Sequence, residues 1–251
     1  GDVSTKDVRE VAVSALGDWE QNSTAISTEN KVPIYKNPSS SVIYLLDKPG
    51  APQSVIRAGF VGVPRGDSHY LALSILNYLF GGQFTARLNL NLRQDKGFSY
   101  GYRSWIEWHR SSSALIAGGG VQTAVTAEAL RETLNEFVGI QGKRPVSQFE
   151  FDGAKAGLLR QFPSSFETSW QVLDQIADLI FDECPDDYYL SLPEKIDSLD
   201  LSQIQAVAGS HIKCNELTIA VVGDRKSIEP GLKKLGLPIQ IVDQNGWPLG
   251  Q

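Results

Sequence analysis

The order of the predicted elements indicates an α+β fold, with a mostly antiparallel sheet and helices packed on one face. Apolar, β-branched runs come in pairs, and segments with helical spacing lie between them. Pairs of strands are interleaved with runs of two or more helices, whereas parallel α/β folds alternate single strands with single helices. With 251 residues, of which 41% are hydrophobic and 21% charged, the chain can bury a large core.

The first 31 residues are predicted to be the tail of a preceding similar domain, and residues 32–251 to form a second domain of that kind. An amphipathic helix with a serine or threonine cap ends at Gly17, and the polar stretch from Asp18 to Lys31 has the composition of a linker. The Gly-Asp pair at the start of the chain recurs at residues 223–224, a domain-sized distance later. Because the sequence contains no methionine, we expect a fragment, with any targeting signal upstream of it. The compartment is left open.

Two apolar runs, Ser41 to Asp47 and Gln53 to Val63, are the first predicted strands of the main domain. A Lys-Pro-Gly turn separates them, so we expect them to pair as an antiparallel hairpin. A helix follows, which Asp67 or Ser68 can cap and which the glycine pair at residues 81–82 ends.

The remaining elements follow from the same signals. Aromatic and β-branched residues predict strands at 98–108 and 114–121, on either side of a polar stretch. Helices are expected where a capping residue precedes apolar residues at a spacing of three or four. Their expected starts are Thr126, Ser147 with Glu150 as a capping box, Phe166, and Ser202 with Gln205, and a last strand spans Leu217 to Val222.

Residues 81–101 carry the pattern that is most specific to a function. A glycine pair leads into a helix, and Gly97 ends that helix before an aromatic strand. Arg93 would close the helix and Tyr100 would open the strand, so a guanidinium and a phenol can point into the same space across the corner. Spacing alone does not prove a function, because arginine suits a helix C-terminus and tyrosine suits a strand.

This stretch reads Gly-Gly-x-Phe-x-x-Arg-Leu and then Leu-Arg-x-x-x-Gly-x-x-Tyr-Gly. It resembles the second half of pitrilysin/insulinase-type zinc peptidases, bacterial processing proteases included. The resemblance implies the α+β fold of their repeated domains. It also implies that Arg93 and Tyr100 reach an active site whose zinc lies in the other half. The residues that match the family's substrate-contacting glycine loop are Gly81, Gly82, Gln83 and Phe84, with Gln83 where the family often has a third glycine.

We expect no metal site in this chain itself. Family members bind zinc through a His-x-x-Glu-His helix, and this motif is absent here. The three histidines, His69, His109 and His211, are far apart in sequence, and no second ligand follows His69 at helical spacing. Two cysteines without a CxxC pattern indicate neither a disulfide framework nor a structural zinc site. This chain alone is therefore expected neither to bind zinc tightly nor to cleave peptides.

Charge and hydropathy narrow the range of partners. The net charge is −6 and the basic residues form no cluster, which argues against nucleic acid and anionic membranes as partners. An apolar run of about 18 residues, the length that a membrane-spanning helix needs, is also missing. We therefore expect a soluble chain with no membrane span.

The resemblance implies the non-catalytic half of a zinc metalloendopeptidase, which closes a substrate chamber together with a zinc-bearing half. That half would belong to the same polypeptide or to a separate subunit, and peptides would be the substrates. Two alternatives stay open. One is a structural homologue of the family without a proteolytic role, and the other is a module that binds extended peptides at a sheet edge.

Overall fold

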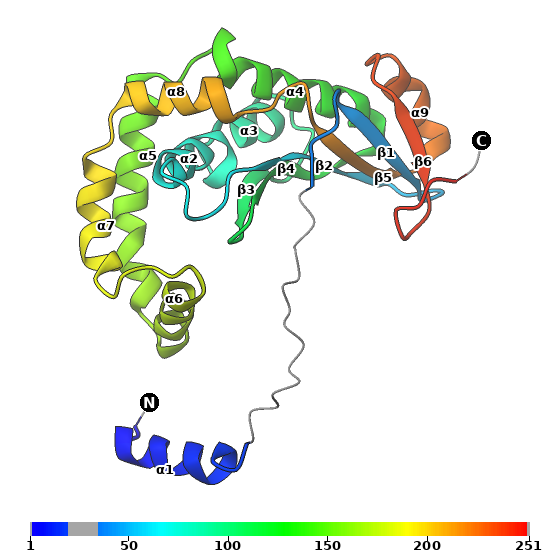
Figure 1. The fold of residues 1–251 in the computed structure, drawn as a ribbon. Coiled ribbons are helices and arrows are strands. Elements are labelled where there is room, and N and C mark those ends of the chain that lie inside the picture. The colour runs from blue at the N-terminus through cyan, green and yellow to red at the C-terminus, as the bar shows by residue number, and fades with distance from the viewer. Residues whose placement is uncertain (1, 20–34, 250–251) are drawn as a thin grey trace.

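The computed structural model describes residues 2–19 and 35–249 (Figure 1). Its first helix, α1 (Thr5–Leu16), begins with a capping box, in which Ser4 and Asp7 each accept a hydrogen bond from the other's backbone N–H. This confirms the first predicted helix, and all of its side chains are exposed. Most of the predicted linker, Asp18 to Lys31, lies outside the described residues.

Residues 35–249 contain a six-stranded sheet in the order β3-β4-β2-β5-β1-β6 (Figure 1). The pairs β3–β4, β4–β2 and β2–β5 are antiparallel, whereas β5–β1 and β1–β6 are parallel. The prediction of a mostly antiparallel sheet is confirmed. The strands are β1 (Val42–Asp47), β2 (Gln53–Gly62), β3 (Tyr102–Trp108), β4 (Ser113–Gln122), β5 (Thr218–Gly223) and β6 (Ile239–Val242).

The predicted hairpin of β1 and β2 is wrong, because β5 lies between these two strands. Val221 of β5 pairs with Leu45 of β1 on one side and with Ile56 of β2 on the other. All three side chains are fully buried. The turn after β1 reverses the chain but does not determine which strand becomes the neighbour, so an apolar strand from much later in the sequence takes the central place. The short strand β6 was not predicted.

Helices pack on one face of this sheet, as predicted. In Figure 1, α2, α3, α4 and α8 gather on the same side of the strands. Short π-helical turns extend three of the helices. The helices of this domain are α2 (Tyr70–Asn77) with η1 (Tyr78–Gly82), α3 (Arg87–Asn89) with η2 (Leu90–Asp95), α4 (Thr126–Val138) with η4 (Gly139–Lys143), α5 (Gln148–Gln161), α6 (Ser169–Phe181), α7 (Tyr188–Asp197), α8 (Leu201–His211) and α9 (Arg225–Lys233).

The alternation of side chains along the strands explains why helices cover only one face. In β2, Ile56 and Ala58 are fully buried, whereas Arg57 between them and Val55 before them are exposed. A strand directs successive side chains to opposite faces, so the apolar set of β2 lies under the helices. Leu130 and Phe137 of α4 are also fully buried in this core.

The predicted cap of α8, Ser202 with Gln205, is wrong by two residues. Asp200 is the cap, and its carboxylate accepts hydrogen bonds from the backbone N–H of Gln203 at 2.9 Å and from the Ser202 hydroxyl at 2.6 Å. Gln205 instead donates from its side chain to the carbonyl of Val146 at 2.8 Å, which ties α8 to the segment before α5. Aspartate and serine are about equally good caps, and Asp200 also has a glutamine three residues later, Gln203, which completes a capping box.

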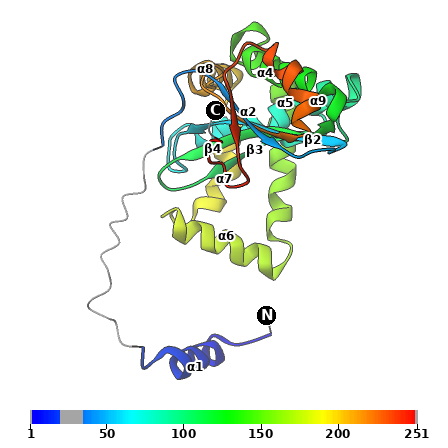
Figure 2. The ribbon, with the colours of Figure 1, turned by 90° about the vertical axis from the view of Figure 1, so that its right-hand side faces the viewer.

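Helices α5, α6 and α7 extend away from the sheet as an arm (Figures 1 and 2). Helix α6 was predicted from apolar residues spaced three to four apart, and it begins at Ser169 instead of Phe166. None of its residues is buried. The predicted apolar stripe is exposed along its whole length: Trp170 by 75%, Leu173 by 51%, Ile176 by 48% and Ile180 by 71%. Helix α7, with a proline inside it, was not predicted.

Candidate functional site

Arg93 and Tyr100 lie at the corner between η2 and β3. The guanidinium carbon of Arg93 is 4.4 Å from the ring centroid of Phe84, a cation–π contact. Tyr100 was expected to open the strand but lies two residues before it, in the connecting loop, and is 90% exposed. Its hydroxyl is accessible from outside the chain. Within residues 35–249, no hydrogen bond or ion pair joins Arg93 to Tyr100.

A buried asparagine holds the two sides of the corner together. The side-chain amide of Asn89 donates to the carbonyl of Phe84 at 2.7 Å, and its oxygen accepts the backbone N–H of Tyr102 at 3.1 Å. Asn89 is only 2% exposed, so water does not compete for these bonds. Sequence reasoning missed this residue, because an asparagine inside a helical stretch carries no signal of such a role.

The loop that carries Tyr100 is fixed on both sides. The hydroxyl of Ser99 donates to the carbonyl of Gly120 at 2.7 Å and accepts the backbone N–H of Gly101 at 3.1 Å. The backbone N–H of Phe98 donates to the carbonyl of Leu92 at 2.9 Å. Gly97 has a φ of +66°, a left-handed conformation that favours glycine and that turns the chain out of η2. Tyr100 is thus an exposed side chain on a hydrogen-bonded backbone.

In the glycine loop, residues 81–84, Gly81 is buried against the sheet and the other residues are at least partly exposed. Gly81 is buried, and a Cβ added to it would lie 2.3 Å from the backbone nitrogen of Ser104 in β3. Packing against β3 therefore explains this glycine. Gly82 is exposed, Gln83 is half-buried, and Phe84 is 52% exposed beside Arg93. Phe84 thus links the open part of the loop to Arg93.

Arg87, which belongs to the same motif, has a structural role. Its guanidinium forms hydrogen bonds with both carboxylate oxygens of Glu150 and with the carbonyls of Arg144 and Pro145. Glu150 is also the N3 residue of the capping box with Ser147, which confirms that prediction for α5. Burial alone would raise the pKa of Glu150, but the hydrogen bonds from Arg87 and Ser147 outweigh it and lower that pKa to about 2. The pair anchors α3 to the start of α5.

Replacing Glu150 by glutamine is expected to lower the free energy of unfolding by about 1–3 kcal/mol at pH 7, since hydrogen bonds to a charged partner are lost and partial exposure reduces their strength. The folded-state pKa lies below the ordinary value of 4.5, so the ionised form is stabilising above pH 4.5. That contribution disappears as the pH falls towards 2. Urea unfolding at pH 7 and pH 3 measures both values. The loss in free energy of unfolding caused by Glu150→Gln should be smaller at pH 3 than at pH 7. Glu194→Gln, at an exposed position of α7, should leave the free energy of unfolding unchanged at both pH values. Equal losses for Glu150→Gln at both pH values would contradict this role.

A pocket of about 1070 Å³ lies between the arm and the outer end of β3 and β4. On its wall the guanidinium carbon of Arg65 lies 3.5 Å from the ring centroid of Tyr70, and Arg65 also forms an ion pair with Asp182 at 3.2 Å. Neither Arg93 nor Tyr100 lines this pocket. Tyr100 lies on the open surface, and Arg93 is half-buried beside Phe84.

The fold and this corner correspond to a known family. A family model described as "Peptidase M16 inactive domain" matches residues 1–158. The chain belongs to the peptidase M16 family. The match confirms the resemblance of residues 81–101 to pitrilysin/insulinase-type peptidases, and it identifies an inactive domain of a zinc protease family.

Two curated relatives and one solved structure illustrate this membership. The "Non-peptidase homolog YmxG" of Helicobacter pylori is 26% identical over 157 residues, and the "Uncharacterized zinc protease YmxG" of Bacillus subtilis is 24% identical over 159 residues. These matches cover 61% and 63% of this chain but only 35% and 39% of the relatives. The M16 inactive domain from Pseudomonas fluorescens shares the fold, with a TM-score of 0.72 at 20% identity over 89% of this chain and 52% of that one.

In the parts of the chain that the structure describes, every helix is too short or too polar to cross a lipid bilayer.

Proposed function

We propose that this M16 domain is the non-catalytic half of a zinc metalloendopeptidase and supplies Tyr100 and Arg93 to an active site on a zinc-bearing half. The observation that supports this most strongly is Tyr100, a 90% exposed phenol on a loop that Ser99 fixes with two hydrogen bonds. An exposed donor, carried on a hydrogen-bonded loop at the corner, suits a site that a second domain completes. Residues 1–31 would then be the tail of a preceding domain of the same kind.

Tyr100 would act on the oxyanion that forms during peptide hydrolysis. Zinc in the other half would activate the water that attacks the scissile carbonyl. The Tyr100 hydroxyl would donate a hydrogen bond to the carbonyl oxygen as negative charge develops there. A preorganised donor of this kind is typically worth about 2.7–4 kcal/mol of transition-state stabilisation.

Arg93 would hold the substrate next to Tyr100. One face of its guanidinium packs on Phe84, which leaves the N–H groups at its edge to donate to peptide carbonyls. The exposed loop residues Gly82 and Phe84 and the half-buried Gln83 would extend this contact surface. Gly81 would affect substrate binding only indirectly, because it packs against β3 and so positions the loop.

The exposed stripe of α6 supports a partner of domain size. Trp170, Leu173, Ile176 and Ile180 lie on one helix face and would cost free energy if left in water. Contiguous apolar patches on soluble domains commonly mark interaction surfaces. We assign this stripe to contact with the zinc-bearing half.

A structural or peptide-binding role without proteolysis is the second candidate, and the printed name of the Helicobacter pylori relative, a non-peptidase homolog, favours it. Both roles would use the same fold. They differ in whether the guanidinium of Arg93 and the phenol of Tyr100 take part in peptide cleavage.

Arg93→Lys distinguishes these two roles. Lysine keeps the charge but loses the planar fork. Loss of one charge-assisted hydrogen bond, about 1.5–3 kcal/mol, predicts a rise in KM of about 10–100-fold with a smaller change in kcat. Steady-state kinetics of the complete two-half enzyme measures both constants, and Arg103→Lys, at an exposed position of β3, serves as the matched control. Unchanged kcat and KM in the folded Arg93 variant would remove Arg93 from the mechanism.

A further inference from the structure

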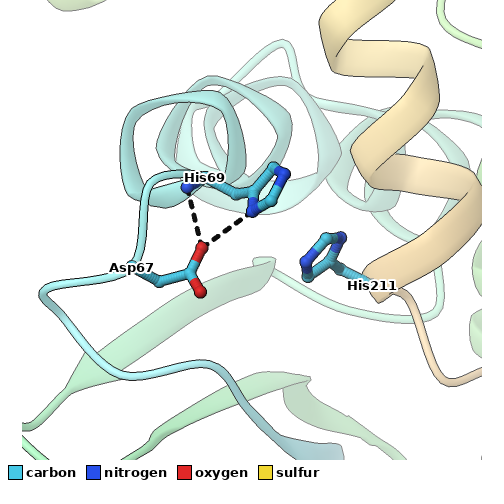
Figure 3. Close-up of side chains that lie close together, drawn as sticks. All are labelled: Asp67, His69 and His211. Carbon is cyan, nitrogen blue, oxygen red and sulfur yellow. Dashed lines mark hydrogen bonds and ion pairs between the residues drawn. The ribbon is translucent and has the colours of Figure 1, made fainter.

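Two histidines and an aspartate from distant parts of the chain converge beside α2 (Figure 3). Asp67 lies in the loop before α2, His69 precedes the first residue of α2, and His211 is the last residue of α8. Each of them offers one ligand atom, and these atoms all lie within 4.8 Å of one another. The two imidazole centroids are 4.5 Å apart.

The surroundings hold these side chains in place. One oxygen of Asp67 lies 2.8 Å from both the backbone nitrogen and Nδ1 of His69. Nδ1 of His211 is 2.8 Å from the hydroxyl of Ser210, so Nε2 is the ring nitrogen of His211 that would bind a metal. A hydrogen bond at Nδ1, as His211 makes, orients a histidine that binds a metal through Nε2. Nδ1 of His69 instead already faces the Asp67 carboxylate and would bind the same ion in place of this hydrogen bond.

A purely structural explanation covers only part of this cluster. Asp67 accepting from the backbone of His69 is a common turn at a helix start, and the Asp67–His69 ion pair can accompany it. Neither interaction requires His211. A second imidazole facing the first, at the end of another helix, adds the ligand type that a transition metal prefers and that calcium and magnesium do not.

We propose that Asp67, His69 and His211 bind one divalent transition-metal ion, preferably zinc. The fourth position of a tetrahedral site would be taken by water, as at other sites with three protein ligands. Zinc–nitrogen distances are about 2.0–2.1 Å, so the ligand atoms must approach one another by rotation of their side chains. This movement is open to them, because His69 is exposed and Asp67 and His211 are only partly buried.

The bound ion would join the loop before α2 to the end of α8, and so fix two helices on the same face of the sheet. This site is independent of the proposed peptidase function, since it uses neither Arg93 nor Tyr100. It replaces the sequence-based expectation that the chain binds no metal. That expectation considered only ligands at helical spacing, and His211 is separated from His69 by most of the domain.

Zinc titration of the tag-free full chain tests the proposal. After dialysis against a chelator, isothermal calorimetry with ZnCl₂ should give one ion per chain, and zinc should raise the Tm. His69→Ala and His211→Ala should each weaken zinc binding by at least about 10–100-fold, since loss of even a second-shell partner commonly costs that much. Co²⁺ should give the visible absorption of a tetrahedral site in the wild-type chain and lose it in both variants.

His109→Ala is the matched control, because His109 is exposed and lies outside the cluster. It should bind zinc like the wild-type chain. Circular dichroism without metal identifies any variant that fails to fold, and His211→Gln, which keeps a polar side chain, would replace His211→Ala in that case. Absence of stoichiometric binding in the wild-type chain, or binding that folded His211 variants retain in full, would overturn the site.

Discussion

Tyr100→Phe is expected to lower kcat of the complete two-half enzyme by about 10²–10³-fold, the usual effect of losing one oxyanion donor. The change removes one hydroxyl and keeps the ring. Because Tyr100 is 90% exposed, the variant should fold like the wild-type chain. KM should change less, since the bond to Tyr100 strengthens mainly as charge develops in the transition state.

Steady-state peptide cleavage by wild-type and variant enzymes measures this effect. Tyr35→Phe is the matched control, because Tyr35 is 72% exposed and has no part in the proposed chemistry. Its kcat should equal that of the wild type. A wild-type kcat in the folded Tyr100 variant would mean that this phenol is not a catalytic donor, and the structural role of the domain would then be favoured.

The fold class was predictable because the spacing of apolar residues reports local structure. Buried Ile56 and Ala58 alternate with exposed Arg57 in β2, and this period of two predicts a strand whatever its neighbours are. The capping box at Ser147 and Glu150 is likewise a local signal. Pairing is not local, which is why the hairpin of β1 and β2 was wrong. The insertion of β5 depends on a strand at residues 218–223 that no turn near residue 50 can encode.

The same difference between local and long-range signals applies to the candidate site. Arg93 and Tyr100 are seven residues apart, so a helix, a glycine and a loop were enough to predict a shared corner. The residues that hold the corner gave no comparable signal. Asn89 acts through two hydrogen bonds to backbone atoms, and the His69–His211 approach depends on how α2 packs against α8. Such contacts appear only when the whole domain is folded.

The apolar stripe on α6 is a case in which the local structure was predicted correctly but its exposure was not. Trp170 and Ile176 have the spacing of a core-facing helix, and the sequence correctly predicted the helix but gave no sign that its apolar face would be exposed. A pattern that normally means burial indicates, in this case, a surface that another domain can cover.

The most direct test of the central proposal is peptide cleavage by separated and recombined halves. The partner in this test would be an M16 half that carries the His-x-x-Glu-His motif, sought in the same gene and in neighbouring genes. Each half is purified alone, and cleavage of a fluorogenic peptide is measured for each and for their mixture in the presence of zinc. We predict that the mixture cleaves at least about 10²-fold faster than either half, because the zinc-bearing half alone lacks the donor that Tyr100 provides. Replacing the glutamate of the partner's motif by glutamine should abolish this activity. Equal cleavage by the zinc-bearing half with and without this chain, or an inactive mixture in which the two halves bind each other, would contradict the proposal.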